Sequence, residues 1–304
     1  MSNRIATAMV SSSTLNDINS ALSALQRSSN ELSSGRTILQ PSDNPYGASH
    51  AIDLQSQLDG LGAYATNVQD AISWENAAGG AMTNMSSVVQ RVRELLVQAS
   101  NGTFSQSSLN SIATEVAQLT ETIKQDANTQ YAGQYVFAGT LTTTRPYQPG
   151  AEDEYQGNVA SISRAIGPGA SVTINTDISS LLGNGSGAKD GKLLDTLRTI
   201  SEHLLSGTPE GRAALNTTDL KAIDASLETL TQLQATAGSM TNQLQAASSR
   251  IEDLETSIAK TLSNTQDADI AKTTIAFSNQ QAAYEAALRA GASIVQESLL
   301  NFLR

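Results

Sequence analysis

Apolar residues recur with helical spacing through both ends of the chain. Between residues 10 and 33 they alternate by three and four positions, which is the spacing of one helical face. The row consists of Leu15, Ile18, Leu22, Leu25, Ser29 and Leu32, and Ser29 is its polar member. The pattern predicts an amphipathic helix over residues 10–33 whose apolar face needs a partner.

Longer rows repeat every seven residues. One consists of Leu54, Leu61, Val68, Glu75, Met82, Val89 and Leu96, with Glu75 as the exception. Another consists of Ile223, Leu230, Ala237, Leu244, Ile251 and Ile258, beside a second row of Leu233, Met240, Ala247 and Leu254. A shorter row predicts a further helix and consists of Leu109, Ile112, Val116, Leu119 and Ile123. A sustained seven-residue repeat predicts a left-handed coiled coil or bundle, with an ordinary bundle core as the alternative; the length of the rows favours the elongated form.

The last helix is predicted over residues 268–303. Its row consists of Ile270, Thr274, Phe277, Gln281, Tyr284, Leu288, Gly291, Val295, Ser298 and Phe302. One helix begins the chain and the other ends it, so we expect helices 10–33 and 268–303 to pair antiparallel. Their rows contain few large apolar side chains, and burial at ~25 cal/mol per Å² barely offsets the entropy of ordering. We therefore expect both ends to be poorly ordered in a free subunit and to fold when neighbouring subunits complete the burial.

The middle of the chain has a different character. It carries four of the six prolines, and short runs rich in β-formers predict strands at 134–137 and 171–175 and a weaker one at 158–163. The fold class is therefore mainly α: a long-helix rod or coiled-coil bundle built from both chain ends, with a small β-containing central insert. The predicted domains are a terminal coiled-coil domain (1–40 and 266–304), a helical rod domain (41–137 and 212–265) and a variable insert (138–211).

Charge and cysteine content exclude several functions. The chain has 18 Lys and Arg against 29 Asp and Glu, a net charge of −11, which argues against binding nucleic acid or anionic membranes. There is no cysteine, which removes disulfides, thiolate catalysis and zinc–sulfur sites. The first ten residues carry Arg4 without a following apolar segment, so we expect no cleavable secretory signal.

The chain offers no catalytic, cofactor or metal site that can be argued from its residues. The two histidines, His50 and His203, lie in separate segments and are expected at the surface or in capping roles. Residues 183–192 fail the phosphate-loop pattern at Ser186 and Leu193, which predicts a flexible loop. Glu152, Asp153 and Glu154 lack the alternating ligands of a calcium loop, so we expect a solvated acidic turn. An enzyme is thus not expected.

Several motifs at the two ends resemble the flagellin superfamily. They are LSSG at 32–35, RVRELLVQASNGT at 91–103, SRIED at 249–253 and LLNFLR at 299–304. The likeness covers about residues 1–140 and 215–304 and leaves out the middle. A coiled-coil scaffold or an export chaperone would account for the helices but not for RVREL with its downstream NGT.

Two further motifs bear on the branch of the superfamily. PSDNP at 41–45 and GQYVFAGT at 133–140 resemble the hook–filament junction branch, whereas RVREL, SRIED and the terminal Leu-Arg are similar to filament flagellin. We favour the junction branch and keep filament flagellin as the alternative.

The resemblance implies a structural, motility-related subunit exported through the flagellar type III system without a cleavable signal, and so an extracellular location. It implies a homo-oligomeric ring that contacts an adjacent hook-associated protein and flagellin, and an export chaperone that binds near the C-terminal helix. No cofactor, nucleic acid or membrane is implied. The expected assembly interface consists of Leu15, Ile18, Leu22, Leu25, Leu32, Arg91, Arg93, Glu94, Ile270, Phe277, Tyr284, Leu288, Val295 and Phe302.

Overall fold

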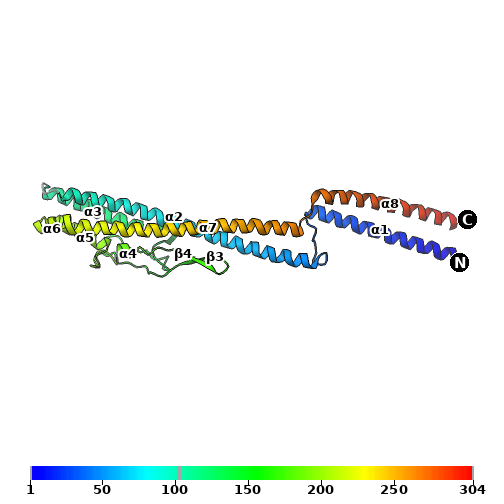
Figure 1. Ribbon diagram of the computed structural model, residues 1–304, viewed down its shortest axis with the longest axis horizontal. Helices are drawn as coiled ribbons and strands as arrows, with labels where there is room; N and C mark the ends of the chain where they lie inside the picture. Colours follow the sequence, from blue (N-terminus) through cyan, green and yellow to red (C-terminus); the bar gives the residue numbers. More distant parts are fainter. Residues whose placement is uncertain (1, 101–103, 303–304) are drawn as a thin grey trace. The chain divides into compact units, whose positions relative to one another are not determined.

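The computed structural model describes residues 2–100 and 104–302, with side chains described over 9–100 and 104–293. The helices are α1 (Ser2–Ser34), α2 (Pro45–Ala99), α3 (Gln106–Ala127), α4 (Ser179–Leu182), α5 (Leu193–Ser206), α6 (Pro209–Ala214), a π-helical turn (Leu215–Asp219), α7 (Leu220–Gln266) and α8 (Ile270–Phe302). Two antiparallel strand pairs are formed by β1 (Gln130–Tyr131) with β2 (Gln134–Tyr135) and by β3 (Ser163–Gly167) with β4 (Ala170–Thr173). The prediction of a mainly α fold, with long helices from both ends and a small strand-containing middle, is confirmed (Figure 1).

The chain forms two compact units, residues 1–60 with 254–304 and residues 61–253. The predicted three-domain boundaries are not tested by this division and stay a prediction. Within the second unit, α2, α3 and α7 lie side by side (Figure 1). The seven-residue rows form their core: every member from Leu61 to Leu96, Glu75 included, is buried, as is every member from Ile223 to Ile251. Trp74, Met82 and Leu96 are among its largest fully buried side chains.

The break between α1 and α2 follows from local sequence. Gly35 has φ +68° and donates its N–H to the Glu31 carbonyl, so it ends α1 as a left-handed C-terminal cap. Asp43 then accepts hydrogen bonds from the N–H groups of Leu39 and Gln40, which lower the pKa of its carboxyl. Asn44 accepts from the Gly47 N–H at 3.0 Å and caps α2, whose first residue is Pro45. The PSDNP motif is thus a closed turn followed by a helix start.

All three strand predictions need correction. Only Gln134 and Tyr135 of the 134–137 run are paired in a strand, whereas Val136 and Phe137 are buried in the core. The run at 171–175 is β4, which begins at Ala170 and ends at Thr173. Of the run predicted at 158–163, only Ser163 belongs to a strand, because Asn158 uses its side-chain oxygen to accept hydrogen bonds from the N–H groups of Thr140 and Ala160 instead of forming a ladder. The hairpin partner of β4 is β3, five residues further along.

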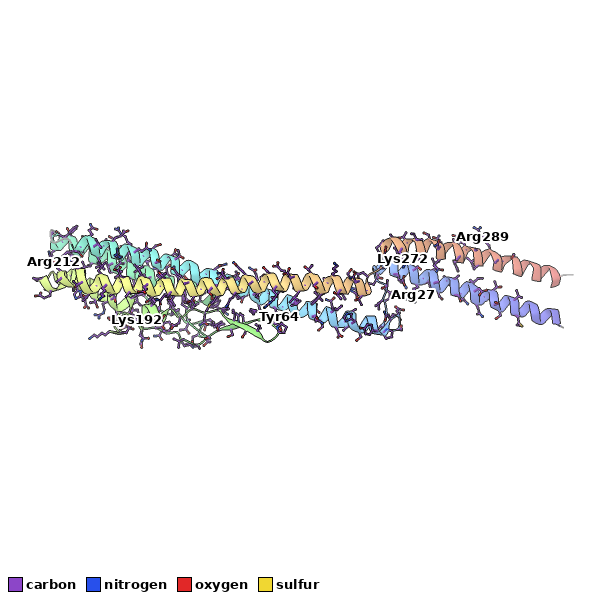
Figure 2. The ribbon with its side chains drawn as sticks, in the orientation of Figure 1. Arg27, Tyr64, Lys192, Arg212, Lys272 and Arg289 are labelled. Atoms are coloured by element: carbon purple, nitrogen blue, oxygen red, sulfur yellow. The ribbon has the colours of Figure 1, made fainter. Side chains whose placement is uncertain are left out.

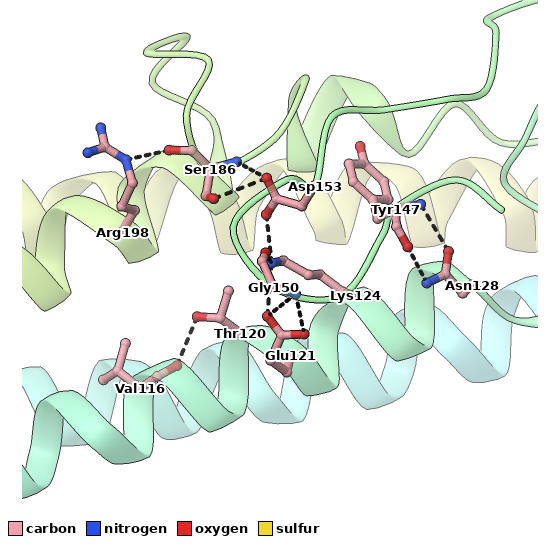
Figure 3. Close-up of polar contacts among 10 residues, drawn as sticks. All are labelled: Val116, Thr120, Glu121, Lys124, Asn128, Tyr147, Gly150, Asp153, Ser186 and Arg198. Carbon is pink, nitrogen blue, oxygen red and sulfur yellow. Dashed lines mark hydrogen bonds and ion pairs between the residues drawn. The ribbon is translucent and has the colours of Figure 1, made fainter.

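The insert packs against α3 through a buried ion pair. Lys124 Nζ lies 2.6 Å from Asp153 Oδ2, with side chains 4% and 2% exposed, and also donates to the Gly150 carbonyl at 2.7 Å (Figure 3). Asp153 further accepts from the N–H of Ser186 at 2.8 Å. The prediction of a solvated acidic turn at 152–154 is therefore wrong for Asp153, because Lys124 compensates its charge in the interior.

Further hydrogen bonds hold the rest of the insert in place. Asn128, at the end of α3, donates to the carbonyl of Tyr147 and accepts from its N–H (Figure 3). The Tyr147 hydroxyl donates to the Gly183 carbonyl at 2.7 Å, and its burial raises the pKa of that phenol. Asp190 accepts from the N–H groups of Asn184 and Lys192. Residues 183–192, predicted as a flexible loop, therefore form turns with their own hydrogen bonds.

Breaking the buried pair is expected to destabilise the unit formed by residues 61–253. Lys124→Met leaves Asp153 charged in the interior and should lower the free energy of unfolding by roughly 3 kcal/mol. Adding Asp153→Leu removes the unpaired buried charge and should recover most of the free energy of unfolding lost in Lys124→Met. The measurement is urea unfolding, with Arg91→Ala as a control that breaks an exposed pair worth under about 1 kcal/mol. Equal changes in the free energy of unfolding for Lys124→Met and the control would contradict a stabilising role of the Lys124–Asp153 pair.

Candidate assembly surface

The two terminal helices, α1 and α8, pair antiparallel. Gly291 lies against α1 so closely that an added Cβ would be 2.9 Å from Ile18 Cδ1 and 3.4 Å from Thr14 Cγ2. At the other end of the pair, the Ala268 N–H donates to the Gly35 carbonyl at 2.8 Å. These contacts place the start of α1 beside the end of α8, so the predicted antiparallel pairing is confirmed.

The seam of this pair is made of small and polar residues. Of the residues of α1 and α8 whose burial is described, the buried ones are Ser28, Thr273 and Gly291. The large apolar residues of the seam are only half-buried: Ile18, Leu22, Leu25, Leu32, Phe277 and Tyr284. The serine of the predicted α1 row therefore needs correction, because Ser28 faces α8 and Ser29 is exposed. In α8, Thr274 and Gln281 are exposed while Thr273 and Gln280 face inward.

Other predicted interface residues point away from the seam. Leu15 is 59% exposed, Ile270 52% and Leu288 43%, so none of them closes the α1–α8 pair. They join further exposed apolar residues that the sequence row did not include: Met9, Val10 and Ile275. The cation Arg289 is also exposed on α8 (Figure 2). Val295 and Phe302 belong to α8 but lie outside the residues whose side chains are described. The pair thus has apolar residues on its outside as well as in its seam.

The charged residues of the RVREL motif already have partners within the chain. Arg91 lies 2.8 Å from Glu115 of α3 and 3.2 Å from Glu94 on its own helix. Arg93 on α2 lies 2.6 Å from Asp224 of α7. The Arg91–Glu94 pair follows from helical spacing, since the two residues are three positions apart, but the pairs across helices depend on tertiary contact. All these side chains are about half exposed, so each pair contributes about 0–1 kcal/mol and leaves donors open to a neighbour.

A groove between α2 and α7 has a buried carboxyl at its base. It is lined by small and polar residues that include Glu75, Gly79, Gly80, Thr83, Gly238 and Thr241. Glu75 is 2% exposed, and neither carboxylate oxygen has a hydrogen-bond partner. Burial alone raises the pKa of Glu75 to about 7. The residue appears in the sequence as the one charged member of its heptad row, and that irregularity is the signal for the site.

The two histidines lie apart, each beside one side chain of the chain itself. His50 stacks on Tyr46, with ring centroids 6.3 Å apart, near the start of α2. His203 is half-buried and its Nδ1 lies 2.7 Å from Asp219 Oδ2, so it links α5 to the π-helical turn instead of lying free at the surface. Among the side chains described, those of residues 9–100 and 104–293, no group of three acidic or histidine residues converges to hold a metal. No helix in the described parts of the chain is long and apolar enough to cross a bilayer.

Both ends of the chain match known family models. Residues 5–142 match the bacterial flagellin N-terminal helical region, and residues 220–303 match the C-terminal helical region. The chain belongs to the flagellin family. The two matches cover α1 to β2 and α7 to α8, which are the helices that form the terminal pair and the bundle.

Relatives of the flagellin family align over nearly the whole chain. Flagellin of Bacillus subtilis (strain 168) is 29% identical over 96% of this chain and 96% of its own length. Flagellar hook-associated protein 3 of Escherichia coli (strain K12) is 25% identical over 94% of this chain and 95% of its own length.

Two solved structures share the fold. Hook-associated protein 3 of Legionella pneumophila has a TM-score of 0.61 at 16% identity, covering 69% of this chain and 97% of that one. FlgL of Bacillus cereus has a TM-score of 0.58 at 20% identity, covering 69% of this chain and 99% of that one.

The structure gives physical roles to the motifs of the flagellin resemblance. LSSG ends α1 at Gly35, and PSDNP is the turn that starts α2. In GQYVFAGT, Gly139 has φ +62°, and a Cβ there would collide with the Asn158 carbonyl oxygen. RVREL holds α2 to α3 and α7, although the NGT that follows it, residues 101–103, lies outside the described residues.

The buried carboxyl of Glu75 should make stability depend on pH. Its pKa is raised from an ordinary value of 4.5 to about 7 in the folded chain, so the unfolded chain releases this proton first as pH rises. Stability should therefore fall between about pH 4.5 and pH 7 and stay lower above, by roughly 2–3 kcal/mol. Glu75→Gln should remove this dependence and stabilise the protein at pH 8, as measured by urea unfolding at pH 5 and pH 8. An unchanged pH profile in the variant would contradict the assignment.

Proposed function

We propose that this chain is a structural subunit of the bacterial flagellum that joins hook to filament as a hook-associated junction protein. The observation that carries the structural role is the α1–α8 pair, whose seam buries Ser28, Thr273 and Gly291 and leaves apolar residues outside. Exposed apolar side chains on paired helices are suited to burial against further copies. Membership of the flagellin family and relatives named for the flagellum support the same role.

The junction role is favoured over a filament role by two segments. The closed turn at 41–45 and the GQYVFAGT segment at 133–140 resemble the junction branch, and both have defined structural roles in this chain. The relatives include flagellin and hook-associated protein 3 at comparable identity, which keeps filament flagellin as the alternative. In either role the chain acts by assembly and not as an enzyme.

The assembly interface includes the α1–α8 pair and the RVREL residues Arg91, Arg93 and Glu94. In this proposal the subunit leaves the cell through the flagellar type III system and forms a homo-oligomeric ring between an adjacent hook-associated protein and flagellin. An export chaperone binds near α8, where it covers the exposed Ile275 and Leu288 before assembly.

Deletion of the gene separates the junction role from the filament role. Loss of a junction protein should leave hooks intact without filaments, while flagellin accumulates in the medium. Electron microscopy of the cells and immunoblotting of the medium measure both results. Filaments that persist after deletion, or their loss without released flagellin, would contradict the junction role.

Complementation with surface variants tests the interface in the same strain. Ile275→Asp places a charge on the outer face of α8 and should abolish restoration of filaments, whereas Val159→Asp, at a similarly exposed position in the insert, should restore them. Equal restoration by both variants would remove α8 from the interface.

A further inference from the structure

Three glycines line the groove between α2 and α7 without an evident reason inside the subunit. A Cβ built on Gly79, Gly80 or Gly238 would meet nothing within 4 Å. Each glycine within a helix is about 1 kcal/mol less favourable than alanine. Folding of the single chain therefore does not explain the missing side chains, whereas close approach of another backbone would.

The base of the same groove holds an unsatisfied acceptor. Both oxygens of Glu75 are buried without a hydrogen-bond partner, and desolvation is the sole cause of its shifted pKa, so no neighbouring charge compensates it. Burying a carboxylate without a hydrogen-bond donor costs free energy of desolvation. A donor from a partner that enters the groove would offset that cost. Around it, Thr83 and Thr241 supply further polar groups. The groove thus accepts a narrow element that carries a hydrogen-bond donor or a positive charge.

We propose that this groove is a docking site for a helix of a second copy of the chain, which directs a lysine or arginine side chain toward Glu75. The choice of a second copy rests on the proposed function, in which subunits of one kind assemble. Charge supports it: subunits with a net charge of −11 repel each other unless their contacts match cations to carboxylates. Exposed cations are present on the long C-terminal helices, at Arg250, Lys260 and Lys272. The glycines let the incoming helix come close enough for such a side chain to reach the base.

Site-specific photo-crosslinking tests the docking in assembled flagella. A photoreactive amino acid replaces Thr83, which is exposed at the groove, and a second variant carries it at Ile275 on α8 as the reference. Irradiation of flagella from the complemented strain should give a covalent dimer from Thr83, with a helical segment of the second copy in the crosslinked peptide. Crosslinks to a different protein, or none from Thr83 while Ile275 crosslinks, would overturn the docking proposal. Absence of both variants from flagella would instead refute the proposed function.

Filling the groove separates docking from folding. Gly238→Gln should lower the Thr83 dimer yield at least tenfold, whereas Gly62→Gln is the matched control, since Gly62 also has nothing within 4 Å but lies outside the groove. Thermal unfolding of both monomers should show no loss of stability, because glutamine is the better helix former. Glu75→Gln should also lower the dimer yield several-fold although its monomer is stable. Equal dimer yields from the Gly238→Gln variant and its control would overturn the proposal.

Discussion

The terminal helices α1 and α8 meet along a seam that is too small and too polar to cover their apolar residues. Ser28, Thr273 and Gly291 occupy its buried positions, while Phe277 and Tyr284 are half-buried and Ile275 is exposed. Hydrophobic stabilisation grows with the apolar area removed from water. Pairing of α1 with α8 alone removes little apolar area and therefore gives little stabilisation. In the proposed assembly, other subunits surround the pair and bury the same side chains further. We therefore propose that the chemistry of the seam couples folding of the chain ends to assembly.

The unit formed by residues 61–253 has the opposite character. Trp74, Met82 and Leu96 fill its core, and the Lys124–Asp153 pair fixes the insert onto α3. We expect such a unit to be stable in a single subunit and to provide a rigid support for surface contacts. Its exception is Glu75, where a carboxyl in a core row is buried without a donor. Unfavourable groups in an otherwise well-packed unit are expected at functional or strained sites, and the glycines that line the same groove as Glu75 fit the docking proposal.

Much of the helical fold and its core could be predicted from the sequence, because the members of a heptad row are expected to be buried. Row members such as Val68, Val89 and Leu244 are fully buried as expected. The sequence does not determine which small polar residues of α1 and α8 face the seam, because serine, threonine and glutamine occur on both sides of it. No large residue decides between Ser28 and Ser29. Asp153 could not be predicted to be buried, since its partner Lys124 is distant in sequence and only the docking of the insert brings them together. The outward direction of Ile270 and Leu288 likewise depends on how α8 is rotated against α1.

We propose that the terminal pair becomes stable through assembly and not through its own seam. Hydrogen exchange of backbone amides, read by mass spectrometry, measures the opening of each helix in the free subunit and in isolated flagella. We expect peptides of α1 and α8 to exchange within seconds in the free subunit and to become strongly protected in flagella. Peptides of α2 and α7 between residues 61 and 253 should be protected in both states. Protection of α1 and α8 in the free subunit equal to that of the bundle would contradict the account.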